Sequence, residues 1–411
     1  MHDQGSLPEI KYDILSPAFF ADPYPTLDRM RAEDPVYWHP LLRSWVLTRY
    51  ADVTKVVRDT GGKFTAARVE QYGAGAPEHV RDKLKVCNEF IGRWISFMDP
   101  PEHTRLRALI AKSFTAQAVE RLRPRIEAIV EQLLAGARER REIEVVAEFA
   151  GPLPRLVFAE LLGIPAEDSD DLRRHGDAIV MLLGAGLVSA EVVEAAHVGT
   201  LYFYEYFQKH IAEKRQHATP DLLSKLIEAR VDGVGMTDDE LVAMCVILML
   251  ANDETTTKLI TNGVLALIRH PDAAREIRND PSLIDNTVDE VMRYDSPTFG
   301  TFRRAVVDND ELGVRIASGD FVLGLLTAAN RDPARFPEPE KFDIHRSDTR
   351  HLSFSSGIHI CPGAATARLE ARVALTALLR ICSEMELATD TLEYPFHMMV
   401  RGPKSLPIRL R

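Results

Sequence analysis

A cysteine, a histidine and several turn-forming residues come together in one short segment, residues 354–363, which reads FSSGIHICPG. Apolar residues at helical spacing follow, so we expect a helix with Pro362 at its first position that runs to about Ser383. Cys361 would then lie at the N-terminal end of this helix, where unpaired backbone amides carry partial positive charge and favour a thiolate. A thiolate can bind iron, whereas most single cysteines are buried and inert. The residues around Cys361 decide between these two interpretations.

A second polar cluster lies inside a long helical pattern, residues 237–269, which a capping box opens at Thr237. The apolar run that precedes residue 251 predicts that this helix crosses the protein interior. Residues 251–257 nevertheless read ANDETTT, where packing alone would favour apolar side chains. Ala251 and Thr255 share a face of the helix, although a helical threonine often only bonds back to the preceding turn.

Two further pairs of charged residues stand at helical spacing. His103 and Arg107 lie one turn apart in a helix that begins after two prolines, and alone they are most simply explained as a solvated basic face. Glu290 and Arg293 lie three residues apart. That spacing is a weak signal by itself, because exposed helical pairs contribute only about 0.2 to 0.5 kcal/mol.

The pattern Phe-x-x-Gly-x-His-x-Cys-x-Gly in residues 354–363 resembles the haem-binding loop of the cytochrome P450 family and matches it at every fixed position. The resemblance implies that Cys361 is the axial thiolate ligand of haem iron, with His359 near a haem propionate and Phe354 beside the sulfur. Gly363, like Gly357, would let the backbone approach a large flat ligand where a Cβ atom would collide. The implied cofactor is haem b, iron protoporphyrin IX.

Other stretches resemble the same family in the same order along the chain. Residues 251–257 are similar to its oxygen-activation segment, in which an acid followed by a threonine, here Glu254 and Thr255, delivers protons. The family usually has glycine where this chain has Asn252, so the local helix geometry and the role of this amide stay open. The resemblance also implies haem contacts for His103, Arg107, Ala251 and Arg303, a structural cluster of Glu290, Arg293 and Arg346, and a substrate pocket at Ala251, Asn252, Thr298, Phe299 and Met398.

Composition favours a globular cytoplasmic protein without a membrane anchor. The 411 residues are 45% hydrophobic and 27% charged, with no uninterrupted apolar run of about 18 residues that could span a bilayer. The N-terminus is polar and does not resemble a signal peptide. A net charge of −11 argues against binding to nucleic acid. Four cysteines without metal-ligand spacing argue against a disulfide framework or a zinc site.

Length alone is compatible with two or three domains of about 150 residues each. The resemblance covers essentially the whole chain, however, and implies a single domain, residues 1–411, with the mainly α cytochrome P450 fold and a smaller β-rich portion. The pattern itself predicts a hairpin of Val36–Trp38 and Ser44–Thr48, then amphipathic helices over residues 118–230. Residues 60–95 have poor periodicity and are typical of a mobile surface segment, which in the family covers the substrate pocket.

The expected reaction is insertion of one oxygen atom from O2 into a small, largely apolar molecule, by hydroxylation or epoxidation. No fused reductase is recognisable, so the electrons would come from NAD(P)H through a ferredoxin and a ferredoxin reductase, and we expect a monomer. One alternative is a peroxide-driven or rearranging haem-thiolate enzyme, against which Glu254 and Thr255 count. The other is a non-catalytic haem protein that senses or carries a ligand, for which no output domain is recognisable.

Overall fold

Helices form most of the molecule, which we describe from a computed structural model over residues 10–59, 62–69, 76–111, 113–184 and 188–411. The helices in these ranges are α1 (Pro17–Ala21), α2 (Tyr24–Glu33), α3 (Tyr50–Arg58), α4 (Arg81–Gly92), α5 (Glu102–Ala111), α6 (Ala116–Glu120), α7 (Arg123–Arg140), α8 (Pro152–Leu162), α9 (Ser169–Gly184), α10 (Ala190–Gln216), α11 (Leu222–Glu228), α12 (Asp238–Arg269), α13 (Pro271–Asn279), α14 (Ile284–Tyr294), α15 (Leu326–Ala329) and α16 (Ala364–Ile381). The expectation of a mainly α fold with a smaller β-rich portion is confirmed.

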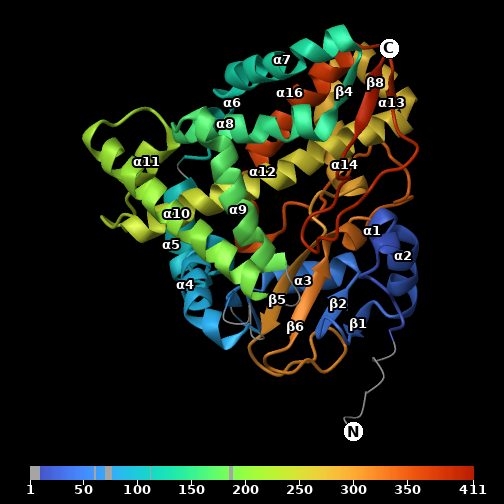
Figure 1. The fold of residues 1–411 in the computed structure, drawn as a ribbon. Helices are drawn as coiled ribbons and strands as arrows, with labels where there is room; N and C mark the ends of the chain where they lie inside the picture. The colour runs from blue at the N-terminus through green and yellow to red at the C-terminus, as the bar shows by residue number, and fades with distance from the viewer. Residues whose placement is uncertain (1–9, 60–61, 70–75, 112, 185–187) are drawn as a thin grey trace.

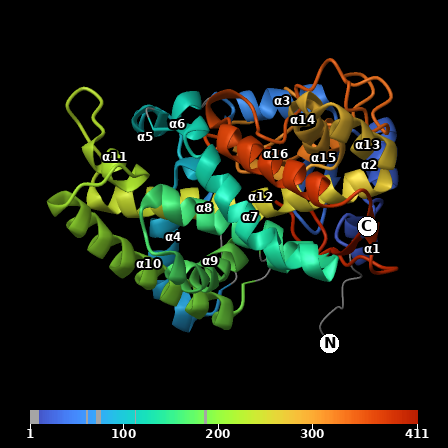
Figure 2. The same cartoon turned by 90° about the horizontal axis from the view of Figure 1, so that it is seen from above.

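The long helix α12 crosses the middle of the molecule, with α10 and α11 near its first turns and α13 at its other end (Figures 1 and 2). The predicted capping box is present, because the Thr237 hydroxyl accepts from the amide of Glu240 and the Glu240 carboxylate accepts from the amide of Thr237. Helices α8, α10 and α16 pack against α12. A helix covered from several sides buries most of its surface, which explains the apolar sequence.

Two small sheets make up the β-rich portion. The first contains β1 (Val36–His39), β2 (Ser44–Leu47), β6 (Phe321–Leu325), β5 (Gly300–Ala305) and β3 (Phe64–Thr65), in that spatial order. Strands β1 and β2 pair antiparallel, which confirms the predicted hairpin. The second sheet contains β4 (Glu142–Glu144), β8 (Pro407–Leu410) and β7 (Met385–Leu387). The first sheet and α1 and α2 lie together, far from α11 (Figure 1).

Helix α12 joins two large apolar clusters. Its N-terminal half, Leu241 to Leu248, packs with residues of α4 and α10. Its C-terminal half, Leu259 to Leu267, packs with residues of α7, α14 and α16. Residues 251–255, between the two halves, are partly or fully exposed. A polar segment between two apolar cores must therefore face a cavity or solvent.

The expectation of an irregular segment over residues 60–95 is wrong in part. Residues 60–61 and 70–75 lie outside the described residues, but α4 occupies residues 81–92. Its buried residues Leu84, Cys87 and Ile91 follow a helical spacing.

Within the described residues, no helix combines the length and the apolar character that a membrane span requires.

Candidate active site

The cysteine loop is closed by a backbone bond between its ends, from the amide of Cys361 to the carbonyl of Phe354 at 2.9 Å. Gly357 has a φ of +73°, a left-handed conformation that favours glycine, and a Cβ atom there would lie 3.1 Å from the Cα of Arg58. Helix α16 begins at Ala364 with Gly363 as its N-cap, so the prediction that Pro362 is the first helical residue is wrong.

The environment of the Cys361 sulfur combines two opposing effects. Burial raises the pKa of the Cys361 thiol above its usual range, and this effect is the larger one. Hydrogen bonds from the backbone amides of Gly363 and Ala364, and the positive charges of Arg107 and Arg368, lower that pKa. The amides at the start of α16 therefore act on the sulfur as the sequence predicted.

A cluster of cationic side chains lines a cavity beside this loop. His103 and Arg107 reach it from α5, Arg303 from β5 and His359 from the cysteine loop, and Arg68 lies with them. The rings of His103 and His359 are 4.4 Å apart. Burial and the charge of Arg303 lower the pKa of His359 to about 3. Burial and the charge of Arg68 lower the pKa of Arg303 to about 10, so the cluster favours an anionic ligand.

Three residues of the α12 polar segment, Ala251, Glu254 and Thr255, line the same cavity. The Thr255 hydroxyl donates to the carbonyl of Ala251 at 2.6 Å, the local bond that a helical threonine commonly makes. Glu254 lies with its carboxylate 3.9 Å from Nε2 of His397. Nδ1 of His397 accepts from the backbone amides of Met399 and Val400 at 3.2 and 3.0 Å, so Nε2 carries the hydrogen, and it makes no hydrogen bond among the described residues.

Asn252 does not line this cavity. Its side-chain amide donates to the carbonyl of Pro154 in α8 at 3.0 Å. The neighbouring Asp253 is partly buried, with its carboxylate 3.9 Å from Arg155, and burial raises the pKa of Asp253 to about 6. The two residues thus connect α12 to α8, and the structure does not place Asn252 with the residues that line the cavity.

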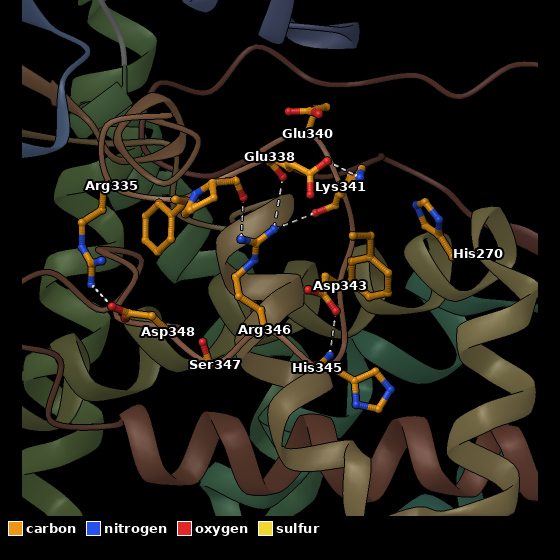
Figure 3. Close-up of a pocket in the computed structure, with 13 residues that line it drawn as sticks. His270, Arg335, Glu338, Glu340, Lys341, Asp343, His345, Arg346, Ser347 and Asp348 are labelled. Atoms are coloured by element: carbon orange, nitrogen blue, oxygen red, sulfur yellow. Dashed lines mark hydrogen bonds and ion pairs between the residues drawn. The ribbon is translucent and has the colours of Figure 1, made fainter.

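Glu290, Arg293 and Arg346 are in contact. The guanidinium of Arg293 donates to both Glu290 oxygens at 2.8 Å, and Nε of Arg346 lies 3.2 Å from Glu290 Oε2. Glu290 and Arg293 are completely buried. Arg346 lies inside a cleft of the loop over residues 335–348, where it donates to three backbone carbonyls (Figure 3), those of Pro337, Glu338 and Lys341. The cluster therefore joins α14 to the chain that leads into the cysteine loop.

Comparison with known proteins identifies the family to which this chain belongs. Residues 188–406 match the family model described as Cytochrome P450. The chain is 38% identical to Cytochrome P450 107B1 of Saccharopolyspora erythraea over 98% of each chain, and 37% identical to the Cyclomarin C epoxidase CymV of Salinispora arenicola over 96% of this chain and 99% of that one. The chain belongs to the cytochrome P450 family. The crystal structure of P450BioI with an acyl carrier protein that bears hexadec-9Z-enoic acid matches this cytochrome P450 with a TM-score of 0.87, at 32% identity, over 96% of this chain and 99% of that one.

Membership makes this protein a cytochrome P450 monooxygenase and implies a haem cofactor, a small-molecule substrate and electron-donating partners. The described residues of this P450 fit a haem. Nδ1 of His103 is buried without a hydrogen-bond partner among them, and the guanidinium groups of Arg107 and Arg303 have no ion-pair partner there. A Cβ atom on Gly363 would meet only the Cys361 sulfur, at 3.9 Å, so this side of the loop is open to a flat ligand.

Several residues expected to contact the substrate do not line the cavity. Phe299 is fully buried against Phe19 and Phe20, with 5.8 Å between ring centroids in each pair. Met398 is buried in the same apolar cluster, and neither it nor Thr298 lines the cavity. Ala251 does line it. Three residues close in sequence to the expected ones also line it, namely Thr301, Met399 and Val400. The rest of the apolar wall is formed by Trp94, Ile95, Phe97, Val180, Leu183, Ile247 and Leu250.

Three residues near the P450 site were not predicted from the sequence. Arg68 is brought to the cavity by the chain that follows β3, which pairs with β5 next to Arg303. His397 stands beside Glu254, and no motif marks it. Glu370 of α16 is fully buried, both its carboxylate oxygens lack a hydrogen-bond partner among the described residues, and burial raises its pKa to about 8.

Proposed function

We propose that this P450 inserts one oxygen atom from O2 into a small, largely apolar organic molecule, by hydroxylation of a C–H bond or epoxidation of a C=C bond. One observation carries the proposal. A single cavity lies between the cysteine loop, the cationic cluster and the Glu254–Thr255 pair, and its remaining wall is mostly apolar. Cofactor, proton donors and an apolar substrate can therefore meet in one cavity.

The residues that would hold haem b are those of the loop and the cluster. Cys361 would bind the iron, His103, Arg107, Arg303 and His359 would bind the two propionates, and Phe354, Gly363 and Ala251 would border the porphyrin. When bound, a thiolate-ligated haem supplies electron density that favours cleavage of the O–O bond. A propionate would also give the guanidinium groups of Arg107 and Arg303 an anionic partner, and such charge-assisted hydrogen bonds are stronger than the neutral bonds that Arg303 makes to Thr301 and to the Phe302 carbonyl.

Glu254 and Thr255 would move protons toward the cavity. Glu254 is partly exposed, and Thr255, whose hydroxyl donates to the carbonyl of Ala251, lines the cavity one position farther along α12. His397 lies 3.9 Å from the Glu254 carboxylate and would contribute to its polar surroundings. Asn252 is held by α8, so we propose a structural role for it and no part in the proton route.

Glu290, Arg293 and Arg346 would act structurally, by holding the chain before the cysteine loop. We also propose that residues 1–411 form one haem-binding domain, and that the protein is a cytoplasmic monomer that receives electrons from NAD(P)H through a ferredoxin and a ferredoxin reductase. A peroxide-driven or rearranging haem-thiolate enzyme is the second candidate. The presence of Glu254 and Thr255 in the cavity wall favours the O2-dependent reaction over it.

Turnover with isotopically labelled dioxygen tests the proposal. The purified P450 is supplied with NADPH, a surrogate ferredoxin and its reductase, and a panel of apolar compounds is analysed by mass spectrometry. We expect one labelled oxygen atom in the product and no product without the redox proteins. Product formed only with hydrogen peroxide, or product without label, would contradict the proposed reaction.

A further inference from the structure

An ion pair joins α16 to α14 just after the cysteine loop. Nε of Arg368, in the second turn of α16, donates to Oδ1 of Asp289 in α14 at 2.7 Å. The two helices pack against each other (Figure 2). The guanidinium carbon of Arg368 lies 4.5 Å from the ring centroid of Phe354, which is within the distance of about 6 Å for a cation–π contact. The pair therefore holds a positive charge over the first residue of the cysteine loop.

The charge of Arg368 acts on the Cys361 sulfur. Burial raises the pKa of the Cys361 thiol, and the charges of Arg107 and Arg368 are among the influences that lower it. The amide of Cys361 donates to the carbonyl of Phe354 at 2.9 Å, so the ring beneath Arg368 and the sulfur belong to one closed loop. A haem propionate would offset the charge of Arg107. The carboxylate that offsets Arg368, in contrast, belongs to the protein itself, at Asp289.

His351 also faces the Asp289 carboxylate. Its Nε2 atom lies 3.5 Å from Asp289 Oδ1, and its ring centroid lies 5.6 Å from that of Phe354. Nδ1 of His351 accepts from the amide of Ser353 at 3.2 Å, so Nε2 carries the hydrogen. Burial lowers the pKa of His351, so the ring is neutral and does not cancel the charge of Asp289. Asp289 is thus held in place and remains the counter-ion of Arg368.

A charged pair at this position affects the electron affinity of an iron ion bound to the sulfur. Reduction adds one electron to the iron, so a nearby positive charge favours the reduced state and a nearby negative charge opposes it. Groups around a metal-bound thiolate are among the features by which a protein sets the reduction potential. Arg368 and Asp289 carry opposite charges, so their removal should shift the potential in opposite directions.

We propose that Asp289 positions the Arg368 guanidinium against Phe354, and that this ion pair sets the reduction potential of the haem iron at Cys361. Arg368 raises the potential and Asp289 limits the rise. The inference rests on the proposed function, in which Cys361 binds the iron. Neither Arg368 nor Asp289 lines the cavity, so the pair would control the uptake of electrons and not the choice of substrate.

Spectroelectrochemical titration of the haem-loaded protein tests the proposal. The Arg368 side chain is 36% exposed, so solvent weakens its field. We expect Arg368→Gln to lower the one-electron equilibrium constant about three- to tenfold, which is a fall of about 30 to 60 mV in the potential. Asp289→Asn should raise the potential, because its side-chain oxygen can still accept from Nε of Arg368 while the negative charge is lost. The double variant removes both charges and should lie between the two single variants.

The matched control is Arg372→Gln. Arg372 donates to Asp285 at 2.8 Å and joins the same two helices, one turn farther along α16 from Cys361. Its substitution should leave the potential nearly unchanged. Equal potentials in Arg368→Gln and Arg372→Gln would overturn the proposal. Shifts of the same sign in Arg368→Gln and Asp289→Asn would also overturn it, because a general disturbance of the loop, and not the two charges, would then explain both.

Haem content and the carbon monoxide complex are measured before each titration. If Arg368→Gln retains too little haem, Asp289→Asn decides alone: a raised potential supports the proposal, and an unchanged or lowered one overturns it. Thiolate-type complexes with unmoved potentials in both single variants would refute only the role of the ion pair, and the proposed function would stand. Absence of the thiolate-type complex from the unmodified protein would instead contradict the binding of iron by Cys361, and with it this proposal.

Discussion

Replacing Arg293 by methionine should destabilise the folded protein by about 3 kcal/mol. Removal of one partner of a buried ion pair costs about 3 to 5 kcal/mol, because the other charge stays buried without compensation. Glu290 would keep the contact with Arg346 at 3.2 Å and the amide of Asp343 at 2.8 Å, so the lower part of that range applies. The backbone carbonyls that would lose a donor are those of Asn330, Pro339 and Lys341.

Thermal unfolding of the haem-loaded protein, followed by circular dichroism, measures this effect. An unfolding entropy of roughly 2.1 cal/mol/K per residue gives roughly 0.9 kcal/mol/K for 411 residues, so the variant should lose roughly 3 to 4 °C in Tm. Arg315→Met is the control. Arg315 pairs with Asp308 at 3.2 Å, but both side chains are exposed, and an exposed pair contributes only about 0 to 1 kcal/mol.

A double-mutant cycle with Glu290→Gln separates the ion pair from the other bonds of Arg293. The two substitutions should be non-additive by about 0.5 to 3 kcal/mol, because the second removes a charge that the first has already left unpaired. If Arg293→Met unfolds at the same temperature as Arg315→Met and keeps its full haem content, the cluster does not stabilise the fold and the reasoning is refuted.

Two further results follow from the site. Thr255→Ala should lower the product formed per NADPH consumed. Asn252→Gly should leave this ratio nearly unchanged, because the Asn252 amide is bonded to the carbonyl of Pro154. Equal ratios in Thr255→Ala and the unmodified protein would show that Thr255 is only a helix residue. Glu370→Gln should become progressively more stable relative to the unmodified protein as the pH rises from 4.5 to about 8, as measured by the free energy of unfolding in urea at several pH values. The sign follows because Glu370 is protonated in the folded state but ionised in the unfolded state over this range, so ionisation favours unfolding; parallel pH profiles for the two proteins would contradict it.

Features encoded by short stretches of sequence could be predicted. The cysteine loop is one of them, since its turns depend on neighbouring residues, although α16 begins at Ala364 and not at Pro362. The capping box of α12 and the contact between Glu290 and Arg293 also depend on spacings of three residues. The amides at the start of α16, which lower the pKa of Cys361, are visible in the sequence, whereas the burial of its sulfur depends on the tertiary fold.

Features set by long-range packing could not be predicted. The segments around Phe299 and Met398 run side by side, with the amide of Phe299 bonded to the carbonyl of Met399. Because side chains alternate along extended chain, a shift of one residue exchanges the inward and outward sets, and the sequence does not define this register. Arg68 reaches the cavity only because β3 pairs with β5, and the sequence around it has no periodicity that would reveal the pairing.

Reduction of the purified protein under carbon monoxide tests the central claim, that Cys361 binds haem iron as a thiolate. The unmodified protein should give the red-shifted Soret band that is characteristic of a thiolate ligand. Cys361→Ser should lose this band. Cys382→Ser, which changes a buried cysteine at the far end of α16, should retain it. A Cys361→Ser variant that keeps the red-shifted band would contradict the assignment.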